Sequence, residues 1–341
     1  MKYPWANTLI LVLVAAELAT GALGLVTGSP DLAVFVLLHR VLGYGLSILL
    51  VWKGALVVGS LRRRRSGPPR YASILLLAGL LASLALGFGW SLAGPFGFWL
   101  FSGLSWHIYA GAALVPVLTW HTIHFTRRLP LSYWADRRSF LRLTGLAIGG
   151  LALTQYGEAA ARTAGLGSPG RRFTGSYPPP ARYDGRFPVV SWFNDRAPDI
   201  DRTSWRLTVG GAVRNEITLA YDELGSTAEV IATIDCTGGW YSEQIWSDQP
   251  MAELLKAAGP SPRASSITVT SATGYYRRFS LEEAEGYMLA TRVGGAELSR
   301  GHGFPIRLVA PGKRGFEWVK WVTRIEVNES PKWLQPPIPL Q

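Results

Sequence analysis

The sequence predicts a multi-domain protein: an all-α transmembrane four-helix bundle with a fifth span, followed by an α+β domain. Long apolar stretches fill the first half of the chain, and short β-branched runs separated by turns fill the second. The charge divides in the same way, because residues 1–142 hold 13 Lys and Arg and 3 Asp and Glu, whereas residues 143–341 hold 21 and 20. Only 17% of all residues are charged, against about 25% in an average soluble chain.

The charge distribution and the cysteine count exclude several classes of protein. The net charge of +11 lies almost wholly in the first half, and the second half is nearly neutral. A nucleic-acid-binding protein carries its basic excess on the folded domain, so no nucleic-acid partner is expected. The single cysteine leaves no disulfide framework and no multi-cysteine zinc or iron–sulfur site.

Four apolar stretches, at 8–26, 32–58, 71–92 and 103–125, approach or exceed the length of roughly 20 residues that crosses a bilayer. A weaker fifth stretch, rich in Gly and Ala, runs over 143–161. We therefore expect a cytochrome-like four-helix membrane domain at 1–130 and a fifth transmembrane segment at 131–165. A linker at 166–182 and a second domain at 183–341 complete the expected organisation.

The connecting loops predict the orientation in the membrane. Arginines are concentrated in the segments between the second and third and between the fourth and fifth stretches, at positions 62–65, 70, 127, 128, 137, 138 and 142. The positive-inside rule places these segments in the cytoplasm. The N-terminus is then inside, and the domain after the fifth stretch lies outside. This predicts a multi-pass protein of a bacterial inner membrane with an extracytoplasmic second domain.

The start of the fifth stretch resembles a twin-arginine export signal. Arg137 and Arg138 precede a modestly apolar, Gly/Ala-rich segment. Such signals normally stand at the N-terminus, so the internal position is a departure from the pattern. The export route carries proteins that fold before they cross, often around a cofactor. The alternative is that these arginines anchor an ordinary helix, and a cleavage site at Ala159-Ala160-Ala161 remains open.

Histidines in the expected spans point to a haem site. Polar residues inside a bilayer are costly and are usually functional. His39 and His107 both lie near the outer ends of their spans, which is the placement that holds one haem iron between two helices. His121 follows His107 by 14 residues, or ~21 Å at 1.5 Å per residue, on the same helix face. We therefore expect one haem b, or two, with interhelical hydrogen bonding as the alternative role.

The spacing of His107 and His121 resembles the two-haem helices of membrane b-type cytochromes. The second stretch departs from that pattern, because Lys53 and not histidine stands 14 residues after His39. His124 is too close to His121 to bind the opposite side of the same haem. An outer haem between His39 and His107 is therefore the stronger prediction, with His121 as a candidate ligand of an inner one.

The second domain reads as a strand-rich α+β fold after the Gly/Pro-rich linker. Strands are expected at 205–211, 230–236, 267–271, 306–309 and 319–327, and a short helix at 251–258 stops at Gly259-Pro260. Two stretches in it carry a resemblance. They are Asp235-Cys236-Thr237-Gly238-Gly239-Trp240 and the segment 301–327, which opens with Gly301-His302-Gly303-Phe304-Pro305. Together they resemble the molybdopterin-binding domain of the sulfite oxidase family, over about residues 186–331.

That family includes the bacterial periplasmic methionine sulfoxide reductase catalytic subunit. The resemblance implies a molybdenum–molybdopterin cofactor, with the thiolate of Cys236 as a metal ligand. Soft sulfur suits such a metal. The resemblance further implies contacts to the cofactor from His302, Arg307 and Lys320, and places Asn194 where the family often has a cofactor-contacting segment. Lys313, Arg314 and the backbone of Gly315 lie in a turn that we expect to reach the same cofactor.

The segment after Cys236 bears on the substrate. Sulfite oxidases place arginines there, whereas this sequence has a neutral segment ending in Trp240 and Tyr241. An oxyanion would lack charge-assisted donors at that point, so a sulfoxide or another uncharged oxygen donor fits better. Core packing is the alternative role for these two aromatic residues. Arg277, Arg278 or Arg314 folding back into the pocket would instead restore a sulfite site.

The two halves together predict an enzyme, a membrane-bound molybdenum oxidoreductase that exchanges electrons with the quinone pool through haem b. Its substrate is expected to be a small molecule or a methionine-sulfoxide-type group. One alternative is oxidation of a sulfite-type substrate, with electrons passed to quinone. The other is a metal-free electron-transfer or binding module.

Overall fold

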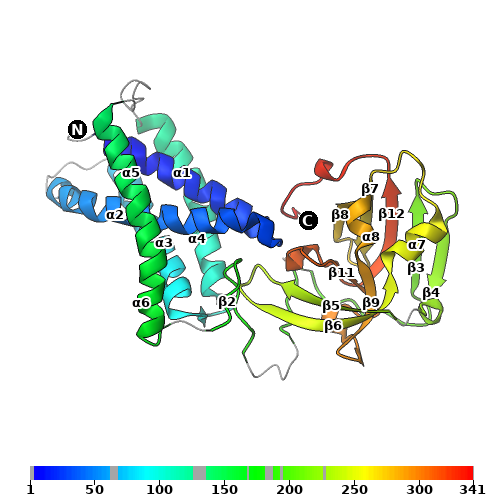
Figure 1. The fold of residues 1–341 in the computed structure, drawn as a ribbon. Helices are drawn as coiled ribbons and strands as arrows, with labels where there is room; N and C mark the ends of the chain where they lie inside the picture. The colour runs from blue at the N-terminus through cyan, green and yellow to red at the C-terminus, as the bar shows by residue number, and fades with distance from the viewer. Residues whose placement is uncertain are drawn as a thin grey trace. The chain divides into compact units, whose positions relative to one another are not determined.

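The computed structural model describes residues 4–61, 68–125, 136–166, 169–180, 187–192, 195–225 and 228–340. The chain divides into two compact units, Met1–Tyr177 and Pro178–Gln341 (Figure 1). The division falls within the expected linker. Asn194 and the arginines at 62–65 and at 127 and 128 lie outside the described residues, as does the side chain of Lys53.

The first unit is helical. Its helices are α1 (Pro4–Val26), α2 (Ala33–Leu61), α3 (Pro68–Phe88), α4 (Gly103–Phe125), α5 (Arg137–Ala152) and α6 (Glu158–Thr163). The helices α1 and α2 pack together, as do α3 and α4, and α5 packs on α2. Small residues permit the close approach of α5, since a Cβ added to Gly150 would lie 2.4 Å from the carbonyl oxygen of Val41.

Three helical segments among the described residues are long and apolar enough to cross a membrane: Trp5–Val26, Pro30–Trp52 and Ile74–Ala93. They match the first three expected spans. The helix α4 has 23 residues but is rich in aromatic residues and histidine, and it is not one of the three. The fifth stretch forms α5, a π-helical turn at Leu153–Gly157 and α6, so it is helical without a long apolar run. The fourth and fifth spans stay predictions.

The second unit contains two five-stranded sheets. In one sheet, β5 (Ala228–Asp235), β6 (Tyr241–Pro250), β9 (Met288–Val293) and β10 (Ala296–Glu297) lie in that order, and β11 (Arg307–Val309) also pairs with β9. The other sheet has the order β4 (Ile217–Ala220), β3 (Arg206–Gly211), β12 (Val322–Asn328), β7 (Ser266–Ser271) and β8 (Tyr276–Ser280). The helices α7 (Met251–Ala258) and α8 (Leu281–Glu285) complete the mixed fold.

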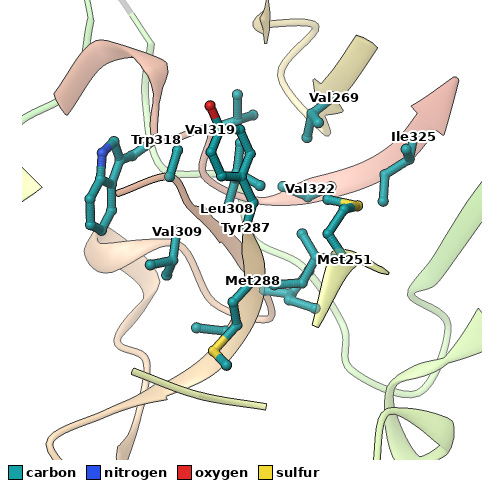
Figure 2. Close-up of a cluster of buried hydrophobic side chains, with 14 of the residues drawn as sticks. Met251, Val269, Tyr287, Met288, Leu308, Val309, Trp318, Val319, Val322 and Ile325 are labelled. Atoms are coloured by element: carbon teal, nitrogen blue, oxygen red, sulfur yellow. The ribbon is translucent and has the colours of Figure 1, made fainter. Parts of the chain in front are cut away.

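One hydrophobic core joins the two sheets and α7. Leu207 and Ile325 from one sheet, Leu289 from the other and Met251 from α7 are fully buried in the same cluster. Figure 2 shows Val269, Met288, Leu308 and Val322 in this cluster, beside Met251. The expected mixture of strands and helices in the second domain is confirmed. The core fixes the ends of β5, β6 and β11, and the candidate site lies at those ends.

Truncation of a core side chain tests this packing. We expect Leu289→Ala to lower the free energy of unfolding by about 2–5 kcal/mol, because the fully buried side chain leaves a cavity between packed neighbours. Ile231→Ala on the same sheet is the matched control, since Ile231 is 68% exposed and should change stability by no more than about 0.5 kcal/mol. Denaturant unfolding of the purified chain, followed by tryptophan fluorescence, measures both variants. Equal losses would contradict the packing described.

Candidate functional site

Cys236 lies in a tight turn between two paired strands. It follows Asp235, the last residue of β5, and the turn ends where β6 begins at Tyr241, opposite Asp235. The amide of Cys236 donates to the carbonyl of Trp240 (2.8 Å), and the amide of Gly239 donates to the carbonyl of Cys236 (3.0 Å). Gly239 has φ of 92°, a conformation that favours glycine. The turn therefore holds the sulfur atom in a defined position.

A small cradle lies over Gly238. A Cβ added to this glycine would lie 3.5 Å from the Cys236 Sγ and 3.9 Å from the Trp240 Nε1, so the thiol and the indole N–H lie on the same patch. The Trp240 Nε1 is buried and has no hydrogen-bond partner among the described residues. The Trp240 ring stacks on Phe187, with centroids 5.9 Å apart. A buried, unpaired donor beside a thiol fits a bound ligand with an acceptor oxygen.

A buried ion pair ties the Cys236 turn to the segment 313–315. The Arg314 Nη1 donates to the Asp235 Oδ1 over 2.5 Å, and both side chains are at most 3% exposed. The Arg314 Nη2 also donates to the carbonyl of Cys236 (3.3 Å). A Cβ added to Gly315 would lie 3.2 Å from the Cys236 Cα. Arg314 and Gly315 thus support the turn, and Lys313 pairs with Glu283 over 2.8 Å.

Arg307 and Lys320 are brought together by Gly303. This glycine has φ of 114°, and a Cβ on it would lie 3.0 Å from the Arg307 Cβ and 3.3 Å from the Lys320 Cβ. Arg307 is 1% exposed, and its guanidinium lies within 5.1–5.9 Å of the rings of Phe187, Trp246 and Trp318.

Arg307 is buried and Lys320 is half-buried, and neither forms an ion pair with a carboxylate among the described residues. The charge of Asp195 compensates that of Lys320 only in part. Arg307 donates only to the carbonyls of His302 (3.0 Å) and Trp318 (3.4 Å), and its Nε has no partner there. Lys320 donates to the Gly301 carbonyl (2.8 Å) and the Ser191 hydroxyl (3.3 Å). Burial lowers the pKa of Arg307 to about 9. Burial, with Arg307 nearby, lowers the pKa of Lys320 to about 7. Such cations are stabilised by an anionic ligand.

Cys236 belongs to the same site as these cations. Burial raises the pKa of the Cys236 thiol, while the Gly238 amide and the charges of Arg314 and Lys320 act in the opposite direction. A metal binds the thiolate form of cysteine, and a bound cation favours that form further. His302 packs beside these groups, because its ring contacts Phe187 with centroids 4.4 Å apart. Both of its ring nitrogens bond to protein groups, since Nε2 donates to the Phe187 carbonyl (2.9 Å) and Nδ1 bonds to the Ser299 hydroxyl (2.8 Å). These residues fit a metal-bearing anionic cofactor.

The first unit brings His39 and His107 together from α2 and α4, with ring centroids 5.8 Å apart. The Nδ1 of His39 bonds to the Glu17 carboxylate (2.6 Å), and the Nδ1 of His107 bonds to the Ser83 carbonyl (2.8 Å). Because a carbonyl only accepts, the His107 Nδ1 carries the proton and its Nε2 keeps a free lone pair. Neither Nε2 has a hydrogen-bond partner among the described residues.

The imidazole pair fits one metal ion held between two nitrogen atoms. A nitrogen–metal bond is about 2 Å long, so two such bonds and two ring radii give a centroid separation of about 6 Å. Glycines make room for both rings, because a Cβ on Gly21 would lie 3.1 Å from His39 and a Cβ on Gly87 would lie 3.0 Å from His107. For His121, the sequence offers no second histidine on another helix of this kind, because the neighbouring histidine, His124, lies on the same helix α4.

Two partner residues were missed in the sequence analysis. Asp235 ends an apolar strand, and a carboxylate at such a buried position requires a cationic partner, which is the signal for Arg314. Glu17 is the only acidic residue in the first apolar stretch, and an ionisable residue in a span is a functional candidate with a partner.

Comparisons with known proteins agree with the geometry of the second unit. Residues 194–334 match the family described as "Oxidoreductase molybdopterin binding domain". The protein-methionine-sulfoxide reductase catalytic subunit MsrP of Xanthomonas campestris is 29% identical over 153 residues, which cover 39% of this chain and 48% of that protein. A nitrate reductase [NADPH] of Beauveria bassiana is 27% identical over 165 residues, covering 39% of this chain and 18% of the relative.

A solved structure, the sulfane dehydrogenase SoxCD from Paracoccus pantotrophus, is 25% identical, covers 39% of this chain and 40% of that chain, and has a TM-score of 0.38. The chain spans about half of the methionine sulfoxide reductase subunit and about a fifth of the nitrate reductase. Its second unit is a molybdopterin-binding oxidoreductase domain.

The buried pair of Asp235 and Arg314 gives a testable stability effect. We expect Arg314→Met to lower the free energy of unfolding by about 3–5 kcal/mol, because it leaves the Asp235 carboxylate buried and uncompensated. The double variant Asp235→Asn with Arg314→Met should lose less than the single variant. Arg202→Met is the control, since its pair with Asp222 is exposed to solvent and should change the free energy of unfolding far less than Arg314→Met. Additive losses in the double variant would contradict the pairing.

Proposed function

We propose that this chain, which carries a molybdopterin-binding oxidoreductase domain, is a membrane-bound enzyme that moves electrons from quinol through haem b to an extracytoplasmic oxygen donor. The observation that carries the proposal is the neutral cradle beside the thiol, where the buried indole N–H of Trp240 and the Cys236 Sγ lie over Gly238. A sulfoxide offers a polar oxygen without a full charge, which suits this single neutral donor.

The molybdenum cofactor would be held by the residues that converge on the Cys236 turn. The Cys236 thiolate would bind the metal, and Arg307 and Lys320, with His302 beside them, would bind the anionic part of the pterin. The bound metal supplies two-electron oxygen-atom transfer. Roles for Asn194, Lys313, Arg314 and Gly315 in contact with the cofactor remain predictions. A metal-free module is disfavoured, because the buried guanidinium of Arg307 would then have no counter-charge among the described residues.

Reduction of a neutral substrate is favoured over oxidation of sulfite by the partners of the nearby arginines. Arg314 pairs with Asp235, and Arg277 donates to the carbonyls of Pro336 (3.3 Å) and Pro337 (3.1 Å). Arg278 donates to hydroxyl groups of its own sheet and of the C-terminal segment. Each of these three arginines is therefore held by other groups of the protein, and Arg314 is held by Asp235 and the Cys236 carbonyl within the turn itself. The name of the relative MsrP supports methionine sulfoxide as the substrate class.

Haem b would be held in the first unit by His39 and His107, and it supplies one-electron transfer. Glu17 and Ser83 orient the two rings by bonding to Nδ1, which leaves Nε2 available to the iron. The three apolar helices support a membrane location. The arginine-rich loops and the twin-arginine-like segment support an extracytoplasmic second unit of a bacterial inner-membrane protein.

Substitutions at the thiol and at the indole separate metal binding from substrate binding. We expect Cys236→Ser to abolish turnover of methionine sulfoxide and to remove one sulfur neighbour from the molybdenum, as measured by X-ray absorption. Trp240→Phe should keep the metal coordination and raise KM by about 2- to 10-fold, because it removes one hydrogen-bond donor and keeps the aromatic ring. Unchanged molybdenum–sulfur coordination in Cys236→Ser would exclude the proposed ligand.

Histidine substitutions test the haem site independently of catalysis. We expect His39→Ala and His107→Ala each to lose the absorption of low-spin haem b, since each removes one of the two histidines that would hold the iron. His121→Ala should retain this absorption if one haem is bound. The pyridine haemochrome assay on detergent-purified protein gives the haem content of each variant. Full retention of low-spin haem in His39→Ala would refute the assignment.

A further inference from the structure

A second polar cluster in the first unit is not explained by the two histidines. Arg40 and Tyr44 are four residues apart on α2, so they share a face of the helix, and that face is turned by about 100–140° from His39. Tyr44 is 9% exposed, and its hydroxyl is buried without a hydrogen-bond partner among the described residues. The Nε of Arg40 is also buried and has no hydrogen-bond partner among the described residues.

Unpaired buried donors are destabilising, and a bound ligand is one of the few explanations for them. The guanidinium of Arg40 already has a charged partner, because its Nη2 forms an ion pair with Glu158 on α6. Arg171 also approaches Glu158, over 3.4 Å. Glu158 is thus shared by two arginines, and neither the Nε–H of Arg40 nor the hydroxyl of Tyr44 meets an acceptor among the described residues. The unmet requirement that these two groups have in common is a hydrogen-bond acceptor.

The surroundings of the Tyr44 hydroxyl suit a flat ring. The Tyr44 ring packs against Phe88, the last residue of α3, with centroids 4.7 Å apart. A Cβ added to Gly157 would meet only the Tyr44 hydroxyl within 4 Å, so space remains beside that oxygen. Gly157 ends a π-helical turn, a distortion that is frequent at functional sites. About a quarter of the Arg40 side chain is exposed (24%), which leaves a route to the pair.

The cluster of Arg40, Tyr44 and Phe88 lies next to the proposed haem ligands in the sequence. Arg40 directly follows His39 on α2. Phe88 directly follows Gly87, the glycine that backs the ring of His107. A ligand held between Tyr44, Arg40 and Phe88 would therefore lie beside both histidine-bearing hairpins, where an electron donor to the haem has to lie.

We propose that Arg40 and Tyr44 bind the headgroup of a membrane quinone or quinol, an inference that rests on the proposed quinol-linked function. The Nε–H of Arg40 and the hydroxyl of Tyr44 donate to one carbonyl oxygen of the headgroup, and Phe88 contacts the edge of its ring. The headgroup is planar and lipid-soluble and carries acceptor oxygens, which matches the two unpaired donors, the aromatic ring of Phe88 and the apolar helices of this unit.

Direct binding tests the proposal without catalysis. Decylubiquinone and menadione are titrated by calorimetry into the full-length, detergent-purified protein. We expect Tyr44→Phe to raise the Kd by about 2- to 10-fold, because only one hydroxyl is lost. Arg40→Lys should have a similar effect, since it keeps the charge that pairs with Glu158 but removes the Nε donor. Tyr156→Phe is the matched control, because Tyr156 is 75% exposed and should leave the Kd unchanged.

Each other outcome has a defined meaning. Absence of quinone binding by the unmodified protein would overturn both this site and the quinol step of the proposed function. Binding that neither Tyr44→Phe nor Arg40→Lys weakens would overturn this site alone. Loss of haem, or a shifted haem spectrum, in Tyr44→Phe with an unchanged quinone Kd would assign the hydroxyl to a carboxylate of the haem, and would also overturn the proposal.

Discussion

The second unit depends on one constraint, which is the burial of the Arg307 guanidinium, with Lys320 half-buried beside it, in the site that holds the only thiol of the chain. Arg307 lies among three aromatic rings and donates to backbone carbonyls alone, which compensate a buried charge poorly. Gly303 makes this arrangement possible, since any side chain there would separate Arg307 from Lys320. An anionic cofactor, as proposed, would compensate the charge of Arg307, and Cys236 would then be available to its metal.

In the first unit, the same arrangement of a histidine, an acceptor for its Nδ1 and a glycine occurs twice. Glu17 and Ser83 each precede a glycine by four residues, and each bonds to the Nδ1 of a histidine on the following helix, while the glycine makes room for the ring. Two helical hairpins therefore present two imidazoles in the same way. The difference between a carboxylate at Glu17 and a carbonyl at Ser83 makes the two rings electronically unequal, because the carboxylate bond gives its ring more anionic character.

Much of this architecture could be predicted from the sequence, and the failures have physical reasons. The helix Met251–Ala258 has the expected bounds because an apolar face and Gly259 define it. The strand β6 was missed because polar residues such as Glu243 and Gln244 interrupt its alternation, although pairing with β5 and β9 holds it. The resemblance predicts that His302, Arg307 and Lys320 belong to the same cofactor site as Cys236. It does not predict the bond of Arg314 to Asp235, which depends on a contact between residues 79 positions apart. Distant pairings of this kind are set by the folded chain and not by local pattern.

The proposed function requires that both units serve one path of electrons. The direct test is an anaerobic optical spectrum of the full-length protein, reduced with a quinol analogue and then mixed with methionine sulfoxide. The account predicts that the bands of reduced haem b appear with the quinol and bleach when the sulfoxide is added. Haem that is reduced by quinol but is not reoxidised by the sulfoxide would contradict it.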